Sequence, residues 1–240
     1  MIVIPARLNS SRFENKILVD ILGVPMVIKT AQQVASLDRV VIATDSQEVI
    51  SLAKEHGIEA VMTSKDHGSG TDRINEAVNS LGVDENEVVV NVQADEPFIE
   101  KEVVKAVIDK VKEHQNDEFT MVSCYKNIDS DLADDPNHVK VVCDSDENAI
   151  YFSRAKIPYH RDHYNKEPYK GHLGIYGFTK KSLNQFCEYE PSVLENVEKL
   201  EQLRAISNTK QIKMVKVESR SFGIDTKEDL ENALRLFGRE

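Results

Sequence analysis

The sequence predicts an α/β fold with a mainly parallel central sheet, and two patterns carry this prediction. Short apolar runs such as residues 2–4 and 88–92 show no polar alternation, which is typical of strands buried on both faces. Between such runs lie segments with apolar residues at helical spacing, such as residues 26–36 and 101–113. Strands that alternate with helices favour a parallel sheet, and such sheets bind ligands at the carboxyl ends of their strands.

The other elements can be placed in order along the chain. We expect strands at residues 39–45, 59–62, 119–124, 139–143, 149–152, 173–178 and 212–217, and helices at 46–56, 71–81, 193–207 and from 226 to about 237. Thr226 with Asp229 fits a capping box at the start of the last helix. Residues 159–171 are aromatic and irregular, and they either cover a site or pack on another subunit.

Length and composition bound the class of protein. The chain has 240 residues, of which 40% are hydrophobic and 30% charged, which fits one large globular α/β domain. The formal net charge of −11 argues against nucleic acid as the principal partner. No window approaches the roughly 18 consecutive apolar residues of a membrane span, so we expect no membrane insertion. Three cysteines without metal-type spacing indicate free thiols in a reducing compartment, so we expect a cytoplasmic protein.

The loop after the first strand is rich in positive charge. Arg7, Arg12 and Lys16 follow the apolar run 2–4, with Glu14 as the single acid among them. Clustered Arg and Lys at the end of a buried strand suit phosphate groups, although a solvated loop with ordinary surface charges is the simpler alternative. A second loop, residues 63–73, is rich in small residues and leads into a helix whose free N–H groups suit phosphate or polar ligand atoms.

Carboxylates stand at two strand-to-helix junctions. Asp95 directly follows the apolar run 88–92, where a charged group is costly unless it is solvated, paired or bound to a metal. Glu100 lies nearer the start of the helix at 101–113, so we favour a site role for Asp95 over a capping role. Asp225 lies just outside the last helix. Cations and carboxylates together are what phosphoryl or nucleotidyl transfer requires, because carboxylates can hold magnesium while cations neutralise a triphosphate.

An ordered set of motifs then identifies a family. The motifs are Pro5-Ala-Arg7 through Lys16, Ala43-Thr-Asp45, His67-Gly-Ser-Gly-Thr71-Asp-Arg73, Val90-Asn-Val-Gln93-Ala-Asp95-Glu-Pro97, His138-Val-Lys-Val-Val142, Tyr151-Phe-Ser-Arg154-Ala-Lys-Ile-Pro158, His172-Leu-Gly-Ile-Tyr176-Gly, Leu200-Glu-Gln-Leu-Arg204 and Gly223-Ile-Asp225-Thr. Together they cover essentially the whole chain. In them the sequence closely resembles the 3-deoxy-manno-octulosonate (Kdo) cytidylyltransferases, also called CMP-Kdo synthetases, of Gram-negative bacteria.

The resemblance implies a fold and a reaction. The fold is a Rossmann-like nucleotidyltransferase domain over residues 1–240, with a smaller inserted subdomain near residues 145–180 that binds sugar and forms a homodimer. The reaction converts CTP and Kdo into CMP-Kdo and pyrophosphate for lipopolysaccharide synthesis. The sugar's anomeric hydroxyl attacks the α-phosphorus of CTP, and Mg²⁺ is the implied cofactor.

The resemblance also implies roles for individual residues. Arg7, Arg12 and Lys16 bind the triphosphate, and Asp95 and Asp225 hold magnesium. Lys16, Arg7, Asp95 and Asp225 are the expected catalytic residues. The expected substrate-binding residues are Arg12, Ser69, Gly70, Thr71, Arg73, Gln93, Arg154, His172, Tyr176, Glu201 and Gln202, with Arg154 as the partner of the sugar's carboxylate. In the plainer alternatives, His172 and Tyr176 are core groups, and Glu201 forms a helix-surface ion pair with Arg204.

The chain departs from the usual family pattern in two places. It has Glu14-Asn15 where Pro-Gly is common, and Ala94 where Gly is common. Asn tolerates the left-handed conformation, so we predict that Asn15 preserves the glycine's turn, whereas Glu14 adds negative charge near the triphosphate. We also predict that Ala94 does not need a positive φ.

Three other functions compete with this reading. The nearest is a cytidylyltransferase for 8-amino-Kdo, against which His67 and Glu96 weakly favour ordinary Kdo. A sialic-acid-type cytidylyltransferase matches less of the chain. A non-catalytic nucleotide-sugar binding protein on the same fold belongs to a different class, and the presence of Lys16, Asp95 and Asp225 argues against it.

Overall fold

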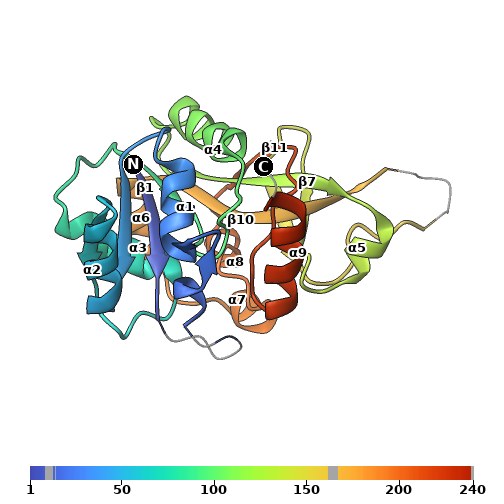
Figure 1. Cartoon of the computed structure of the whole chain (residues 1–240). Helices are drawn as coiled ribbons and strands as arrows, with labels where there is room; N and C mark the ends of the chain where they lie inside the picture. Colours follow the sequence, from blue (N-terminus) through green and yellow to red (C-terminus); the bar gives the residue numbers. More distant parts are fainter. Residues whose placement is uncertain (9–12, 14, 162–166, 239–240) are drawn as a thin grey trace.

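The computed structural model describes the chain except residues 9–12, 14, 162–166 and 239–240 (Figure 1). The predictions for Arg12 and Glu14 therefore lie outside the described residues. The strands are β1 (Ile2–Ala6), β2 (Asp20–Ile21), β3 (Val24–Pro25), β4 (Val40–Thr44), β5 (Glu59–Met62), β6 (Val88–Asn91), β7 (Met121–Ile128), β8 (Lys140–Cys143), β9 (Ala149–Ser153), β10 (Tyr169–Thr179) and β11 (Lys213–Lys216).

Helices connect most of these strands. They are α1 (Met26–Val34), α2 (Gln47–Glu55), α3 (Gly70–Ser80), α4 (Lys101–Glu113), α5 (Ser130–Asp134), α6 (Lys180–Glu188), α7 (Val193–Glu198), α8 (Leu203–Ser207) and α9 (Lys227–Phe237), with a short 3-10 helix η1 (Lys16–Leu18). The α/β fold expected from the sequence is therefore confirmed. No helix of the described chain combines the length and the apolar character that crossing a bilayer requires.

One main sheet carries the architecture. Its order is β11-β7-β10-β6-β1-β4-β5, with β8 and β9 added beside β10. The pairs β1–β4, β1–β6, β4–β5 and β7–β11 are parallel, whereas β10 runs antiparallel to both β6 and β7. The sheet is thus mainly parallel around β1, as predicted. Because the parallel strands β1, β4 and β6 end at the same edge, the loops that follow them converge there.

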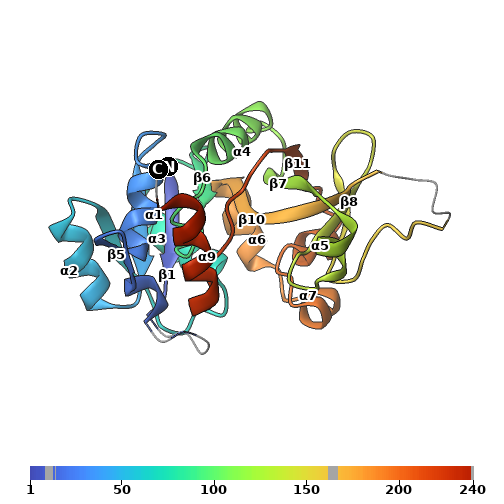
Figure 2. The same cartoon turned by 45° about the vertical axis from the view of Figure 1, so that its right-hand side comes forward.

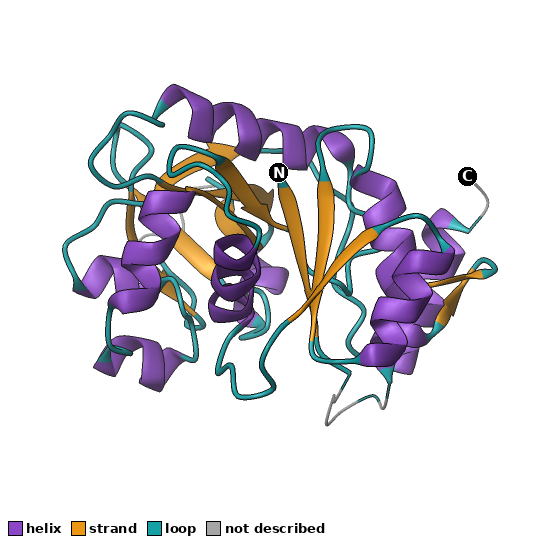
Figure 3. Ribbon diagram, turned by 90° about the vertical axis from the view of Figure 1, so that its left-hand side faces the viewer, coloured by secondary structure: helices purple, strands orange, loops and turns teal. Residues whose placement is uncertain are grey.

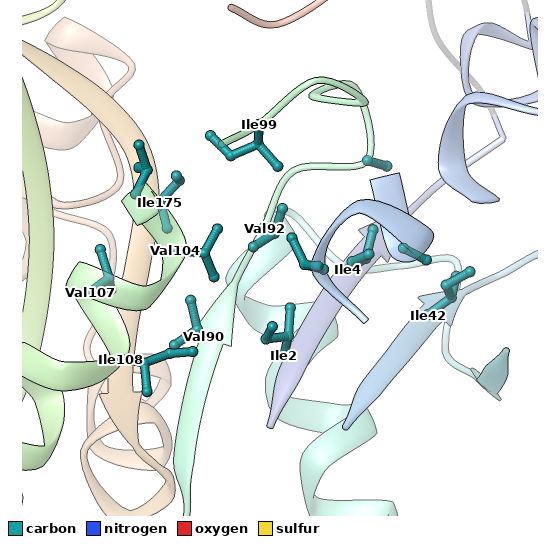
Figure 4. Packing of buried hydrophobic residues seen from close by; sticks show 14 of the residues in the cluster. Ile2, Ile4, Ile42, Val90, Val92, Ile99, Val104, Val107, Ile108 and Ile175 are labelled. Carbon is teal, nitrogen blue, oxygen red and sulfur yellow. The ribbon is translucent and has the colours of Figure 1, made fainter. Parts of the chain in front are cut away.

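Helices cover both faces of the sheet (Figure 3). Ile2 and Ile4 of β1 pack with residues of α1, α2 and α4 on one face, whereas Val3 packs with residues of α3 and α6 on the other. Figure 4 shows the first of these clusters, with Ile2, Ile4 and Val90 directed toward one another. Successive strand residues point to opposite faces, which explains why the buried strands show no polar alternation.

Close packing of α4 explains a glycine in β10. A Cβ built on Gly177 would meet Val111 Cγ2 at 2.5 Å and Val107 Cγ1 at 2.8 Å. Both valines belong to α4, so a larger residue at 177 would push this helix away from the sheet. The alternation of glycine with larger residues at 173–178 therefore marks a strand that a helix approaches closely.

Two helix predictions were wrong. Residues 193–207 do not form one helix, because Lys199 adopts a left-handed conformation (φ 55°) that ends α7, and α8 starts only at Leu203. The helix α6 was missed altogether, although Thr179 caps it by accepting a hydrogen bond from Ser182 N and Leu183 and Phe186 bury its inner face. The second case has a sequence signal, a Thr cap followed by apolar residues at helical spacing.

The small conformational predictions were correct. Asn15 has φ 51°, so it adopts the predicted left-handed conformation. Ala94 is not among the described residues with positive φ. Thr226 and Asp229 form the predicted capping box at the start of α9. In Figure 2, α9 lies between the end of the molecule that holds α2 and β5 and the end that holds β8, α5 and α7.

Candidate active site

A polar cavity of about 640 Å³ opens at the sheet edge where β1 and β6 end. Its lining comes from the loops that follow these strands, from the turn before α3, from the end of β9 and from the segment before α9. It contains most of the expected site: Arg7, Lys16, Ser69, Gly70, Arg73, Gln93, Asp95, Arg154 and Asp225, together with His67 and Lys199. Residues predicted from widely separated motifs thus meet in one place.

Lys16 joins the two predicted magnesium ligands. Its Nζ donates hydrogen bonds to Asp95 Oδ2 at 2.6 Å and to Asp225 Oδ1 at 2.7 Å. Burial alone would lower the pKa of Lys16, but the carboxylates of Asp95 and Asp225 outweigh it and raise that pKa. Lys16 is therefore a charged ammonium held between two carboxylates at the mouth of the cavity.

The backbone brings Asp225 to Asp95. Ile224 N donates to Asp95 O at 2.9 Å, and Asp225 N donates to Asp229 Oδ2 at 3.0 Å. The second bond uses the carboxylate that also caps α9, so the N-terminus of α9 positions Asp225. The two acids lie far apart in the sequence, and these contacts are what places them opposite one another. The helix α4 begins at Lys101, so Asp95 is not its cap.

The site can be tested for its fit to Mg²⁺. Asp95 and Asp225 each direct one carboxylate oxygen at the same cation, the Lys16 ammonium, which stands where a metal ion would find the same two oxygens. Carboxylate oxygens are the hard ligands that Mg²⁺ prefers, and it is commonly bound by one or two carboxylates with substrate phosphates supplying the rest. The described residues include no group of three or more His, Cys, Asp or Glu that could hold a metal ion by itself. The pair therefore fits Mg²⁺ that is held jointly with a phosphate ligand.

The turn before α3 approaches β1 closely. Ser69 caps α3 by accepting a hydrogen bond from Asp72 N, and its hydroxyl donates to Asp72 Oδ2 at 2.9 Å. A Cβ on Gly70 would lie 3.3 Å from Pro5 Cγ, so a larger residue here would crowd the wall of the cavity. Ser69 and Gly70 therefore present the start of α3, with its free N–H groups, to the cavity.

Arg73 differs from the expectation of a purely substrate-binding residue. Although it borders the cavity, its guanidinium is buried and donates to Asp45 Oδ2 at 2.9 Å, Thr63 Oγ1 at 2.7 Å and Ser64 O at 3.1 Å. These bonds join α3 to the ends of β4 and β5. The described contacts thus give Arg73 a structural role, with Asp45 as its partner.

The opposite wall of the cavity holds Arg154. Its guanidinium donates to three backbone carbonyls, those of Glu198 at 2.7 Å, Pro136 at 3.0 Å and Lys199 at 3.3 Å. Gln93 lines the same cavity, and its Nε2 donates to Gly174 O at 3.2 Å. Both side chains are held by neutral carbonyl groups rather than by carboxylates.

Five predicted residues, Thr71, His172, Tyr176, Glu201 and Gln202, form a largely buried cluster beside the cavity rather than on its wall. Tyr176 Oη donates to Gln202 Oε1 at 2.9 Å, and Thr71 Oγ1 donates to Glu201 Oε1 at 2.9 Å. His172 Nε2 lies 2.8 Å from Ser123 Oγ, and burial lowers the pKa of this histidine to about 3, so it is neutral. Glu201 Oε2 and Gln202 Nε2 are buried without a hydrogen-bond partner among the described residues.

Unpartnered polar atoms of this kind are costly unless a ligand or water reaches them. The alternative in which Glu201 forms a helix-surface pair with Arg204 is wrong. Glu201 is partly buried and its Oε1 accepts from Thr71, whereas Arg204 forms a two-point ion pair with Glu195, with distances of 2.6 and 2.9 Å.

Two further basic residues on the cavity wall were not predicted as site residues. His67 precedes the Ser69–Gly70 turn and pairs with Glu76, and Lys199 follows α7. His67 stands inside one of the family motifs, so its position was a usable signal. Lys199 borders a motif without belonging to it, and only the turn that separates α7 from α8 brings it to the cavity.

Comparison with known proteins places these features in a family. The cytidylyltransferase family model matches residues 1–212. A 3-deoxy-manno-octulosonate cytidylyltransferase of Wolinella succinogenes is 50% identical over 242 residues, covering 99% of each chain, and one of a Nitratiruptor species is 52% identical over 96% of each chain.

A solved structure agrees with these relatives. CMP:2-keto-3-deoxy-manno-octonic acid synthetase complexed with CTP has a TM-score of 0.90 and 35% identity, with 99% of this chain and 98% of that chain covered. The alignments extend over the whole order of strands, helices and cavity residues described above. This chain therefore belongs to the cytidylyltransferase family, among the 3-deoxy-manno-octulosonate cytidylyltransferases.

Proposed function

We propose that this enzyme transfers CMP from CTP to the anomeric hydroxyl of Kdo, giving CMP-Kdo and pyrophosphate for lipopolysaccharide synthesis. The single observation that carries the proposal is the Lys16 ammonium held between Asp95 and Asp225 in a cavity lined by further cations. The relatives named for the same reaction cover almost the whole chain.

The side of the cavity that holds Arg7, Lys16, Asp95 and Asp225, here called the phosphate side, binds the triphosphate. Arg7 and Lys16 supply local positive charge in a chain whose formal net charge is −11, and the turn Ser69–Gly70 supplies N–H groups at the start of α3. Arg12 belongs to the same loop by sequence. When the sugar hydroxyl attacks the α-phosphorus, the bond to the leaving pyrophosphate breaks and its electrons remain on pyrophosphate oxygen. Arg7 and Lys16 stabilise the charge that accumulates there.

Asp95 and Asp225 are the residues that would hold Mg²⁺. When bound, the ion neutralises phosphate oxygens and so supplies electrostatic stabilisation of the leaving group. The Lys16 ammonium beside these carboxylates would be available to a phosphate oxygen of the substrate. The carboxylate pair thus keeps Lys16 charged and close by until the substrate arrives.

The side of the cavity that holds Gln93 and Arg154, here called the sugar side, binds the acceptor sugar. Arg154 faces the cavity with a planar guanidinium that suits the sugar's carboxylate, and Gln93 suits a hydroxyl. The unpartnered atoms Glu201 Oε2 and Gln202 Nε2 offer an acceptor and a donor for further hydroxyl groups. His172 is neutral and acts there only as a hydrogen-bonding group, because burial lowers its pKa to about 3.

Pyrophosphate release tests this function. The protein is incubated with CTP and Mg²⁺ and with Kdo, 8-amino-Kdo or a sialic acid, and pyrophosphate and the CMP-sugar are measured. We expect turnover with Kdo that exceeds turnover with either other sugar. Higher turnover with 8-amino-Kdo would identify the modified sugar as the substrate. Release with none of the three sugars would overturn the enzymatic function.

We also propose a cytoplasmic homodimer whose interface includes the region around Tyr159. The Tyr159 side chain is 86% exposed, and it borders a hollow of about 880 Å³ together with Pro158 and Tyr169. Exposed aromatic residues are typical of protein interfaces. All three cysteines are free, as expected in a reducing compartment. Sedimentation velocity should show a dimer that Tyr159→Glu weakens, and a monomeric wild-type protein would contradict the proposal.

A further inference from the structure

The carboxylate of Glu198 holds the backbone that carries Arg154. Glu198 Oε2 accepts a hydrogen bond from Arg154 N at 2.9 Å, and Glu198 Oε1 accepts one from Ser153 Oγ at 2.7 Å. Glu198 is the last residue of α7, and Ser153 is the last residue of β9. One side chain therefore joins the end of a helix to the end of a strand, at the residue that enters the cavity.

The end of α7 also holds the Arg154 side chain. Arg154 Nε donates to Glu198 O at 2.7 Å, and Nη2 donates to Lys199 O at 3.3 Å. The last carbonyls of a helix have no partner within it, and a cation at that end is favourable. The left-handed turn at Lys199 (φ 55°) ends α7 at this point, so the guanidinium caps a helix whose own backbone stops there. The cap thereby fixes the plane of the guanidinium.

Lys140 of β8 holds the backbone carbonyl of Arg154. Its side chain is fully buried, and Nζ donates to Arg154 O at 2.7 Å and to Asp135 O at 3.1 Å. Burial lowers the pKa of Lys140. No carboxylate of the described residues forms an ion pair with it. Burying an ammonium whose partners are carbonyl groups costs free energy. Here the ammonium of Lys140 holds the backbone carbonyl of Arg154.

Arg154 is thus held at its backbone N–H, at its backbone carbonyl and at its guanidinium, and it lines the cavity. Glu198 holds its backbone N–H, Lys140 holds its backbone carbonyl, and three carbonyls accept from its guanidinium. A guanidinium has five N–H groups, so two remain for a ligand. A rigid pair of N–H groups matches the two oxygens of a carboxylate.

We propose that Glu198 is a positioning residue that acts through Arg154 and so sets the preference of the enzyme for a sugar acid. This inference rests on the proposed function, in which Arg154 binds the carboxylate of the acceptor sugar. Lys140 supports the same residue from the strand β8. Neither Glu198 nor Lys140 lines the cavity, so their effect on the sugar passes through Arg154.

The experiment compares Glu198→Gln, Arg154→Ala and the double variant by steady-state kinetics with Kdo and CTP. Gln keeps the size of Glu198 but presents an NH₂ group to donors that need an acceptor. We expect Arg154→Ala to raise KM for the sugar by about 30-fold or more and Glu198→Gln to raise it by about 10-fold, with KM for CTP changed less than about twofold in each. The double variant should match Arg154→Ala alone, because residues that act as a unit are not additive.

Ser192→Ala is the matched control. Ser192 forms the capping box of the same helix with Glu195, at the end away from Arg154. Losing a cap costs about 1 kcal/mol, so this variant weakens α7 without touching the Arg154 contacts. We expect a lower melting temperature and a KM for the sugar within about twofold of wild type.

The outcomes separate the two proposals. If Arg154→Ala raises KM for the sugar but Glu198→Gln does not, the positioning role is wrong while the proposed role of Arg154 stands. Effects of Glu198→Gln and Arg154→Ala that multiply in the double variant would also overturn it. If Arg154→Ala leaves KM for the sugar unchanged, the proposed carboxylate site fails and the inference fails with it.

A second variant covers the case in which Glu198→Gln does not fold. Ser153→Ala removes one of the partners of the Glu198 carboxylate and leaves the others in place. We expect it to raise KM for the sugar about threefold with KM for CTP unchanged. An unchanged KM for the sugar in this variant would overturn the inference.

Discussion

The two sides of the cavity hold their charges in opposite ways. On the phosphate side, Lys16 is paired with the carboxylates of Asp95 and Asp225, and the Asp225 side chain is 43% exposed. On the sugar side, Arg154 and Lys140 donate to backbone carbonyls and form no ion pair with a described carboxylate. The Lys16 ammonium is thus paired with carboxylates, whereas the side chains of Arg154 and of Lys140, which does not line the cavity, are held by neutral carbonyl groups.

This difference predicts that the ion pairs around Lys16 are exchanged when substrate binds, whereas the geometry around Arg154 is preorganised. In the proposed function a triphosphate would pair with the Lys16 ammonium and Mg²⁺ with the two carboxylates, so we expect the phosphate side to reorganise when substrate binds. The sugar side loses no ion pair on binding, and its geometry is set before the sugar arrives. Substitutions on the phosphate side should therefore act mainly on turnover, and those around Arg154 mainly on KM for the sugar.

Lys16→Met should have the largest effect. It removes a cation that we propose stabilises the leaving group and leaves Asp95 facing Asp225, so we expect kcat to fall by about 10³-fold in the pyrophosphate-release assay. Lys101→Met, at an exposed position in α4, is the matched control and should leave kcat unchanged. A loss of less than about tenfold for Lys16→Met would show that turnover does not depend on this ammonium.

Asp225→Asn should reduce kcat by about 100-fold and raise the Mg²⁺ concentration needed for half-maximal rate, because it removes half of the carboxylate pair. The melting temperature should change little, since the Asp225 side chain is partly exposed and its backbone N–H keeps its bond to Asp229. Asp109→Asn in α4 is the control for loss of a surface charge. A variant that unfolds instead of losing turnover would make Asp225 a structural residue.

Arg73→Met tests whether Arg73 binds substrate, as Lys16 is proposed to do, or stabilises the fold through its ion pair with Asp45. Removing one partner of a buried ion pair costs about 3–5 kcal/mol, so we expect a loss of about 3 kcal/mol in the free energy of unfolding measured in urea. Arg39→Met breaks a surface pair with Glu59, in which both side chains are more than 40% exposed, and should cost less than about 1 kcal/mol. Lost activity without lost stability in Arg73→Met would return Arg73 to the substrate-binding residues.

Glu96→Gln should have the smallest effect, which is a change in how the stability of the fold depends on pH. Burial, with a smaller contribution from Asp95, raises the pKa of Glu96 from 4.5 to about 8. Between these values the folded protein keeps a proton that the unfolded chain loses, so this group favours folding below pH 4.5 and its contribution is lost as the pH rises through about 8.

Thermal melting from pH 5 to 9 checks this prediction. Wild type should lose stability across the range, whereas Glu96→Gln should lose about 1–2 kcal/mol less. Glu102→Gln, on the exposed side of α4, should follow the wild-type curve. Parallel curves for wild type and Glu96→Gln would show that Glu96 ionises as an ordinary carboxyl group.

The site was predicted unevenly, and the reason is physical. Lys16, Asp95 and Asp225 stand at ends of elements where charge is conspicuous, so their meeting could be expected once the sheet was placed. Glu198 carries no comparable signal, because a Glu in an amphipathic helix is ordinary in sequence. Lys140 lies inside the motif at residues 138–142, but a Lys in a short strand does not indicate a contact with Arg154. Their importance comes from contacts with Arg154, a residue 44 positions from one and 14 from the other.

The sequence by itself determined the α/β class, the mainly parallel sheet and the loops that carry charge, because apolar periodicity and turn residues act over a few neighbouring positions. It also determined that Asn15 takes the left-handed turn and that Thr226 caps α9, which are local choices of the backbone. Tertiary structure alone decided that Arg73 forms an ion pair with Asp45 and that Lys199 divides one predicted helix into two. These outcomes depend on which distant donors and acceptors meet, and long-range pairing leaves no periodic trace in the chain.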